Sequence, residues 1–170
     1  MRPTHAKAVA GVDLIKAPHR QAMLADLIET LRHELRSQGD GCVPRCENLL
    51  GKIAVLNDSA CIAGLLPLLD DDAEHDELMF SLIHTIERFD DATYVRAITD
   101  HLGACFAASP RWIVVLHMRM LNSPSTSAAY ADCIKALPKN ERDIVRTILE
   151  AVQKRKPTFM ASCDALLAVI

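Results

Sequence analysis

The sequence predicts an all-α fold, and three observations support this prediction. Half of the 170 residues are hydrophobic but only 4% are aromatic, and leucine, alanine and isoleucine dominate over strand-like runs of valine, threonine and tyrosine. Apolar residues recur at helical spacing through most of the chain. Short polar clusters with proline, asparagine and aspartate separate these segments, as helix caps and turns do. The length fits one domain, residues 1–170, in which residues 1–16 could form a flexible arm.

Four helices are expected in the first half of the chain. The first spans residues 18–38 and carries a single apolar stripe that ends at the glycines around Asp40. A second helix is expected from about 45 to 56, and a third from 60 to 69, after a turn of asparagine, aspartate and serine. We expect these two helices to form an antiparallel pair. The fourth helix, from about 75 to 89, has one apolar stripe and one acidic face.

Five more helices are expected in the second half. Asp90 opens a helix that continues to Ser109, and Ser109 is the expected N-cap of the next helix, with a proline in its first turn. This next helix, residues 111–121, is apolar nearly all round, so we expect it to be the central helix of the fold, with Trp112 buried. Asn122 should end it in the left-handed conformation that asparagine tolerates. The last three helices are expected at residues 125–137, 142–154 and 158–170.

The eight helices after the first fall into four successive pairs that recur at about 30 to 35 residues. This period is typical of helical-repeat arrays, in which antiparallel hairpins stack on one another. The expected pairs are residues 45–69, 75–107, 111–137 and 140–168. We therefore predict stacked antiparallel helical hairpins in an α-solenoid of the HEAT type, with an irregular helical bundle as the alternative.

Charge is distributed unevenly along the chain. Residues 70–91, named here the acidic segment, contain nine acidic residues and one arginine, which gives a local charge of −8 in a chain whose total is −3. Residues 111–156, in contrast, hold nine Lys or Arg against four acidic residues. The two halves should therefore present opposite potentials. Blocks of like charge are often kept for a partner of opposite sign, although a solvated acidic helix start gives the same pattern.

Two side chains do not fit their surroundings in this pattern. Phe80 lies among carboxylates, so it should either pack against a neighbouring helix or meet a partner. Arg119 lies on the apolar helix 111–121, and a partly buried guanidinium needs a carboxylate to offset its desolvation. Glu87 is its expected partner. The residues that we expect to be structural are Glu87, Trp112, Arg119 and Asn122.

Catalytic and metal-binding patterns are weak. Three groups of residues have spacings that occur at metal sites, but none has the second set of ligands that such a site would need. With six glycines, the chain also lacks a Gly-x-Ser-x-Gly turn and a glycine-rich phosphate loop. We therefore predict no metal, no cofactor and no enzymatic activity, and a helical metalloenzyme is a distant alternative. The three groups are His84 and Glu87 with Glu77, His101 with Cys105, and Cys42 with Cys46.

The sequence also restricts the location and the partners. A pI near 6.1 argues against nucleic acid as a direct ligand, because phosphate binding needs a basic footprint. No apolar run reaches the roughly 20 residues that span a membrane, and the apolar residues near the N-terminus stop at Asp13, before a signal peptide forms. We therefore expect a cytoplasmic protein with no direct membrane or nucleic-acid partner. Its six cysteines are expected to be free, mostly buried thiols.

Three short pieces of sequence occur in a characteristic order: the run from Glu77 to Glu87, the triplet Pro110-Arg111-Trp112, and the run from Arg119 to Ser123. Together they resemble the all-helical bacterial immunity proteins of immunity protein family 30, over about residues 45–155. The resemblance implies a protein that binds and neutralises the C-terminal toxin domain of a contact-dependent inhibition or related polymorphic toxin system, encoded beside it. A helical-repeat scaffold with an unrelated cellular partner is the alternative, and the sequence does not indicate an oligomeric state.

The acidic segment is the expected contact surface for such a toxin. If the toxin is a nuclease, its active-site groove should be basic in order to hold phosphate. An acidic immunity protein could then mimic the substrate and associate fast through electrostatic steering. The expected partner-binding residues are Asp71, Asp72, Asp76, Glu77, Phe80 and His84.

Overall fold

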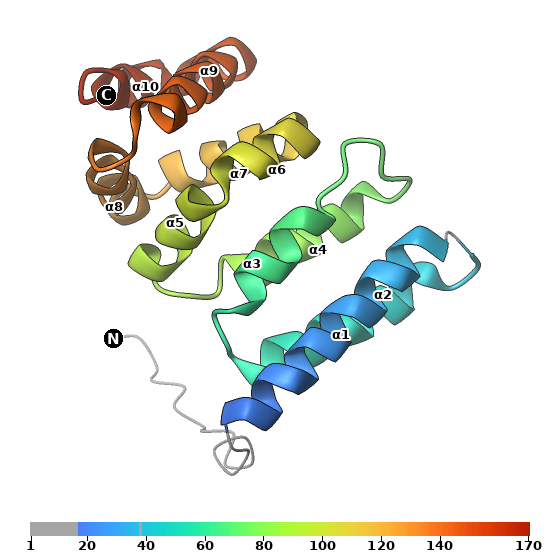
Figure 1. Cartoon of the computed structure of the whole chain (residues 1–170). Coiled ribbons are helices and arrows are strands. Elements are labelled where there is room, and N and C mark those ends of the chain that lie inside the picture. The colour runs from blue at the N-terminus through green and yellow to red at the C-terminus, as the bar shows by residue number, and fades with distance from the viewer. Residues whose placement is uncertain (1–16, 38) are drawn as a thin grey trace, which may run out of the picture.

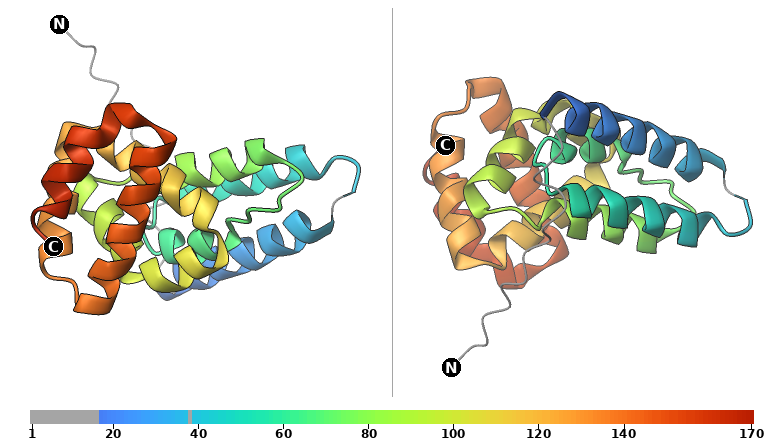
Figure 2. Two further views of the ribbon diagram at one scale, coloured as in Figure 1. Left: turned by 90° about the horizontal axis from the view of Figure 1, so that it is seen from above. Right: turned by 90° about the horizontal axis from the view of Figure 1, so that it is seen from below.

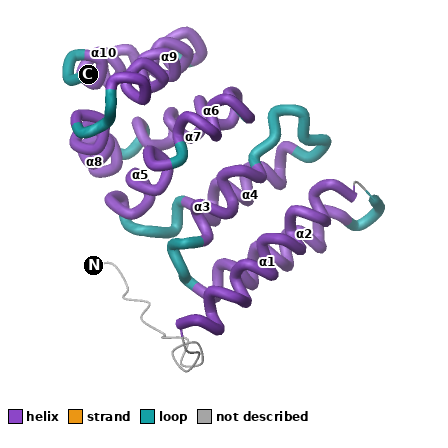
Figure 3. Tube along the Cα trace, viewed as in Figure 1, coloured by secondary structure: helices purple, strands orange, loops and turns teal. Residues whose placement is uncertain are grey.

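The computed structural model describes residues 17–37 and 39–170, and these residues are all-α (Figure 1). They form ten α-helices and two short 3₁₀ turns without any strand, joined by short loops (Figure 3). None of these helices is both long enough and apolar enough to cross a membrane. The predicted fold class is therefore confirmed, whereas the predicted arm, residues 1–16, lies outside the described residues. The elements are α1 (Ala17–Ser37), α2 (Cys42–Leu56), α3 (Cys61–Leu65), η1 (Leu66–Leu68), α4 (Asp76–Ile86), α5 (Asp91–Asp100), α6 (Leu102–Ala108), α7 (Pro110–Leu121), α8 (Pro124–Lys135), α9 (Lys139–Arg155), η2 (Pro157–Phe159) and α10 (Met160–Leu167).

The helices pack as antiparallel hairpins stacked in one direction, from α1 and α2 at one end to α9 and α10 at the other (Figure 1). α3, continued by η1, lies against α4 in the second layer. The third layer is a hairpin of two broken helices, because α5 lies beside α8 and α6 lies beside α7. α9 then packs on α7 and on α10. The helices of the first and last layers run in different directions, so the stack twists (Figure 2).

The predicted pairing of helices 45–56 and 60–69 is wrong. α2 packs against α1 and α4, and α3 packs against α1, α4 and α5. α1 is a long helix with one buried stripe, and α2 covers this stripe. Gly64 lets α3 approach α1 closely, since a Cβ atom at this position would lie 2.5 Å from Cδ1 of Ile28. The first two hairpins are therefore α1 with α2 and α3 with α4, one helix earlier than the sequence suggested.

The single helix predicted over residues 90–109 is in fact two helices, α5 and α6, and the predicted count of nine helices was too low by one. His101 interrupts the helix with φ −115° and ψ 8°. Just before it, the Thr99 hydroxyl donates to the backbone carbonyls of Val95, at 3.1 Å, and Arg96, at 2.9 Å. Such a bond back to the preceding turn does not by itself end a helix, because Thr30 and Thr147 bond back four residues in the same way inside α1 and α9. The break therefore lies in the backbone angles of His101, and a separate helix, α6, starts after it.

α7 lies in the middle of the fold, as predicted, and contacts α6, α8 and α9. Eight of its twelve residues are buried, and Trp112 is 1% exposed. Burial on several sides explains why this helix is apolar nearly all round. All six cysteines are free thiols, and five of them are buried, which confirms the prediction for the cysteines.

Candidate functional site

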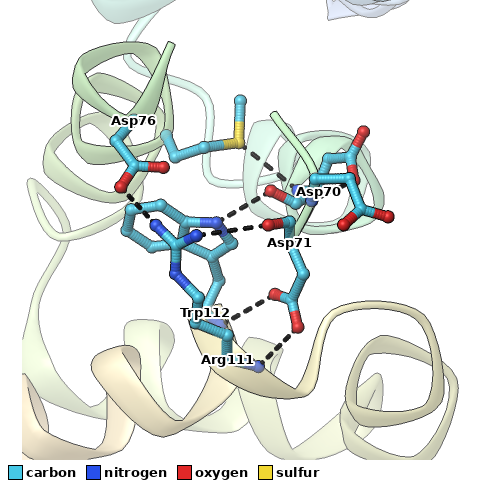
Figure 4. A network of polar contacts seen from close by, with 7 residues as sticks. Asp70, Asp71, Asp76, Arg111 and Trp112 are labelled. Atoms are coloured by element: carbon cyan, nitrogen blue, oxygen red, sulfur yellow. Dashed lines mark hydrogen bonds and ion pairs between the residues drawn. The ribbon is translucent and has the colours of Figure 1, made fainter. Parts of the chain in front are cut away.

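Asp71 holds the N-terminus of α7 from a loop in the preceding layer (Figure 4). Its two carboxylate oxygens accept hydrogen bonds from the backbone N–H groups of Arg111, at 2.8 Å, and Trp112, at 3.2 Å. These N–H groups belong to the first turn of a helix, where they have no partner within the helix itself. Asp71 therefore caps the N-terminus of α7 from outside the helix, in place of the side chain of Ser109 at the N-cap position, and its negative charge also complements the helix dipole.

Ser109 occupies the N-cap position of α7 as predicted, but its side chain does not cap the helix. Its hydroxyl makes no capping hydrogen bond and instead donates to the backbone carbonyl of Leu69. Ser109 is 3% exposed, and a buried carbonyl without a donor would be costly. The serine hydroxyl therefore satisfies Leu69, and the cap comes from Asp71.

The side chains of Arg111 and Trp112 also bind the loop that contains Asp71 (Figure 4). The indole Nε1–H of Trp112 donates to the carbonyl of Asp70 at 2.8 Å. The Arg111 guanidinium donates to the carbonyl of Asp71 at 3.2 Å and forms an ion pair with Asp76 at the start of α4. It also lies over the Trp112 ring, 4.6 Å from its centroid. The hydrogen bond to Asp76 raises the pKa of Arg111, so this cation is permanently charged.

Phe80 packs against a neighbouring helix, which is the first of the two expectations for an aromatic among carboxylates. Its ring packs edge-on against Trp112, with the two centroids 5.0 Å apart. It nevertheless keeps 40% of its surface exposed. Phe80 thus joins α4 to α7 and still presents an aromatic edge to solvent.

The other predicted partner-binding residues, Asp72, Glu77 and His84, are exposed but differ in their contacts within the protein. Asp72 is exposed, and its backbone N–H donates to the Asp70 carboxylate at 2.9 Å. The Glu77 side chain is 62% exposed and has His75 Nδ1 at 3.5 Å. His84 is also exposed, but it lies in a shallow groove between α2 and α4, beside Arg88. The structure therefore gathers Asp71, Asp76 and Phe80 around α7 and leaves Asp72 and Glu77 facing solvent.

A pocket beside the acidic segment was not predicted. It has a volume of about 310 Å³ and lies between the end of α1, the start of α2, the segment from η1 to the first turn of α4, and the end of α6. Its lining comes from four separate parts of the sequence, so no local pattern could have indicated it. The lining residues include Arg32, Leu35, Arg36, Cys42, Leu68, Leu69, Asp70, Ala73, Glu74, His75, Leu78, Met79, Ala108 and Ser109.

Arg119 on α7 forms a bidentate ion pair with Glu87, which follows α4. Its Nε lies 2.5 Å and its Nη2 2.6 Å from the two carboxylate oxygens. The side chains are 37% and 21% exposed, so the pair is half-buried. The hydrogen bond to Glu87 raises the pKa of Arg119. Asn122 ends α7 through its backbone N–H with φ −77°, so the predicted left-handed conformation at Asn122 is wrong.

The three groups with metal-like spacing do not assemble into larger clusters. In the described ranges, no three His, Cys, Asp or Glu side chains lie close enough together to hold one metal ion. The sulfur atoms of Cys42 and Cys46 are 3.8 Å apart, and Cys42 donates to the Glu34 carbonyl at 3.3 Å. Burial raises the pKa of Cys46 to about 12, so its thiol stays protonated at neutral pH.

The family model of immunity protein 30 matches residues 22–130. The chain belongs to the immunity protein 30 family. The match begins inside α1 and ends inside α8, so it starts earlier and ends earlier than the resemblance at residues 45–155 suggested. It includes the Asp71 cap, the Arg111 and Trp112 contacts and the Glu87–Arg119 pair of this immunity protein. No curated protein and no solved structure matches the chain.

Proposed function

We propose that this immunity protein acts in the bacterial cytoplasm by binding the C-terminal domain of one cognate toxin, a nuclease of a contact-dependent inhibition or related polymorphic toxin system. The proposed contact surface is the acidic segment around Asp72, Glu77 and Phe80. Binding is its only proposed activity, with no cofactor. The observation that carries this proposal is the concentration of acidic side chains on a loop and helix start that are fixed to the core.

The charge of this surface is only partly neutralised within the protein. Asp76 is paired with Arg111, and Asp71 is engaged by the N-terminus of α7. Asp72, Glu74 and Glu77, in contrast, are exposed, and no Lys or Arg of the described chain pairs with them. A nuclease needs a basic groove for phosphate, so these free carboxylates match the charge of such a toxin.

The contacts of Asp71 and Asp76 give these two residues a positioning role in the proposal. Asp71 connects the loop to α7, and Asp76 connects the start of α4 to α7, so the exposed carboxylates lie on segments that are attached to the central helix. A surface that is ordered before binding loses less conformational entropy on association. Phe80 adds an exposed aromatic edge next to these charges, and aromatic residues are enriched among the residues that dominate binding energy. His84 lies one helical turn after Phe80 and would contact the toxin at the border of the surface.

Coexpression of this immunity protein with the toxin domain encoded beside it tests the proposal. The wild-type protein should restore growth, and the double variant Asp72→Lys/Glu77→Lys should lose protection, because like charges would then meet. A matched control reverses two exposed acids on α9, Asp143→Lys/Glu150→Lys, and should protect as well as wild type. Loss of toxicity without any complex, or equal protection by both double variants, would contradict the proposal.

A further inference from the structure

The pocket beside the acidic segment has an apolar floor. Leu68, Leu69, Leu78 and Met79 line it, and each of them is at most 8% exposed. Its mouth is open to solvent, because exposed residues from α1, the loop before α4 and the end of α6 border it. Its volume of about 310 Å³ is at the lower end of the range for pockets that hold small ligands, roughly 300 to 1,000 Å³.

The polar groups at the base of this pocket are already used inside the protein. The Ser109 hydroxyl donates to the backbone carbonyl of Leu69, and the Cys42 thiol donates to the backbone carbonyl of Glu34. The Met79 sulfur accepts from the backbone N–H of Asp70 at 3.3 Å. A polar ligand would have to give up its hydrogen bonds with water and would find few replacements at the floor. The tip of a suitable occupant is therefore apolar.

The rim of the pocket carries charges of opposite sign on different walls. Arg36 lies on the α1 wall, where no ion pair with a described residue engages it, whereas the neighbouring Arg32 is paired with Glu29 at 2.6 Å. Asp70 and Glu74 lie on the wall formed by the loop between η1 and α4. A rim with positive charge on one wall and negative charge on another favours one orientation of a bound chain and disfavours the reverse.

We infer that this pocket receives one large apolar side chain of the toxin, a leucine, methionine or phenylalanine. This side chain is flanked in the toxin by a basic residue that faces Asp70 and Glu74 and by an acidic residue that faces Arg36. The inference rests on the proposed function and specifies where the toxin is anchored. Asp70 and Glu74 belong both to the pocket rim and to the acidic segment, so the anchor site and the charged surface form one continuous interface. A side chain buried in a pocket and surrounded by a polar rim has the arrangement that dominates binding energy in protein complexes.

Blocking the pocket mouth tests this inference. Ala108 is exposed at the end of α6, so Ala108→Trp places an indole at the mouth without changing the core. Ala104→Trp is the matched control, because Ala104 is exposed on the same helix and does not line the pocket. Binding to the toxin domain encoded beside this protein is measured by titration calorimetry. The Ala108→Trp variant should bind at least about 30-fold more weakly, the size of a hot-spot effect, and Ala104→Trp should bind like wild type.

A second variant addresses the charged rim and does not depend on a bulky substitution. Arg36→Glu should weaken binding, whereas Lys52→Glu, an equal change of charge at an exposed site on α2, should not. An alanine scan of the toxin should find one large apolar residue whose loss costs affinity with the wild-type protein but not with Ala108→Trp. Wild-type affinity of both Ala108→Trp and Arg36→Glu would overturn the pocket inference and leave the proposed function intact. Failure of the wild-type protein to bind the toxin would instead overturn the proposed function.

Discussion

Asp71 caps the helix that contains Trp112, although 41 residues separate the two in sequence, and the hydrogen bond between them measures 3.2 Å. The same indole returns a hydrogen bond to the loop, through the carbonyl of Asp70. The most buried helix of the fold and the most acidic part of the surface are thus one connected unit. A change at the acidic surface that removes Asp71 should therefore affect the core, and a change at Trp112 should affect the surface.

The first prediction concerns the cap itself. Asp71→Ala leaves the N–H groups of Arg111 and Trp112 without their acceptor, and loss of such a cap costs about 0.5 to 2 kcal/mol of unfolding free energy. In a chain of this length each kcal/mol lowers the melting temperature by about 2 to 4 °C. Asp72→Ala, a neighbouring change at an exposed side chain, should leave the melting temperature nearly unchanged. Thermal unfolding followed by circular dichroism measures both, and equal melting temperatures for the two variants would show that Asp71 does not hold α7.

The second prediction concerns the only tryptophan of the chain. Trp112→Ala should cost about 3 to 5 kcal/mol, the usual range for a large aromatic side chain removed from a core. Trp112→Phe keeps much of the apolar surface but leaves the Asp70 carbonyl without its donor, so it should cost less than the alanine variant and more than zero. Chemical denaturation gives both values. A negligible loss in Trp112→Ala would place α7 at the periphery of the fold.

Local sequence patterns predicted those features of the fold that neighbouring residues determine. Apolar periodicity located the helices, and Asp90 caps α5 by accepting from the N–H of Thr93 at 3.0 Å, as an aspartate before a helix should. The Glu87–Arg119 contact was also predicted, because an arginine on an apolar helix needs a carboxylate and the acidic segment supplies one. This inference used the charge of Arg119 and the apolar pattern of the helix around it, and both can be read from the sequence.

Features that depend on tertiary contacts could not be predicted in this way. A serine before a proline favours a local cap, but Ser109 lies near the Leu69 carbonyl in the folded chain and its hydroxyl is used there. The pairing of α1 with α2 and of α3 with α4 depends on which apolar stripes meet in the folded chain, and periodicity within one helix does not show this. The pocket combines residues from four parts of the chain. The sequence shows the net charge of the acidic segment. It does not show which of its carboxylates are paired inside the protein, because this depends on where Arg111 lies in the folded chain.

The third prediction concerns the Glu87–Arg119 pair. Arg119→Met and Glu87→Gln should each lower the unfolding free energy by about 1 to 3 kcal/mol, because each leaves a charged partner half-buried. This is less than the roughly 3 to 5 kcal/mol for a fully buried pair. A double-mutant cycle should give a coupling energy well above that of Arg96 with Asp100, whose side chains are 80% and 62% exposed and 3.9 Å apart. Equal coupling energies for the two pairs would assign Glu87 and Arg119 to binding and not to stability.

The fourth prediction concerns stability at mildly acidic pH. His117 is fully buried on α7, its ring packs against Tyr130, and burial lowers its pKa to about 4 from a usual value of 6.5. The unfolded chain therefore binds a proton at this histidine below pH 6.5, while the folded chain binds it only near pH 4. The stability that neutral His117 contributes is complete above pH 6.5 and is lost as the pH falls through 4. The lowered pKa values of Asp90 and Asp91 act in a more acidic range, below their usual 3.8.

Urea denaturation between pH 7.5 and 4.5 measures this dependence. The wild-type protein should lose stability steadily below pH 6.5, and His117→Leu should show a flatter profile over the same range. His33→Gln, at an exposed position on α1, should keep the wild-type profile. The explanation fails if the His117→Leu and wild-type profiles are parallel.

The fifth prediction concerns the rate of toxin binding, because exposed charges at an interface act mainly on association. The Debye length falls from about 10 Å at 0.1 M salt to about 3 Å at 1 M, so the association rate of the wild-type protein with the toxin domain should fall steeply over this range. Asp72→Lys/Glu77→Lys should associate slowly at low salt and lose most of this dependence.

Asp76 is left unchanged in this variant because its reversal would also break the Arg111 pair and disturb the loop. Asp143→Lys/Glu150→Lys is the control with the same change of net charge and should retain the wild-type salt dependence. Stopped-flow fluorescence of Trp112 or surface plasmon resonance measures these rates. A wild-type salt dependence that survives in Asp72→Lys/Glu77→Lys would move the contact surface away from the acidic segment, to the basic residues between Lys135 and Lys156.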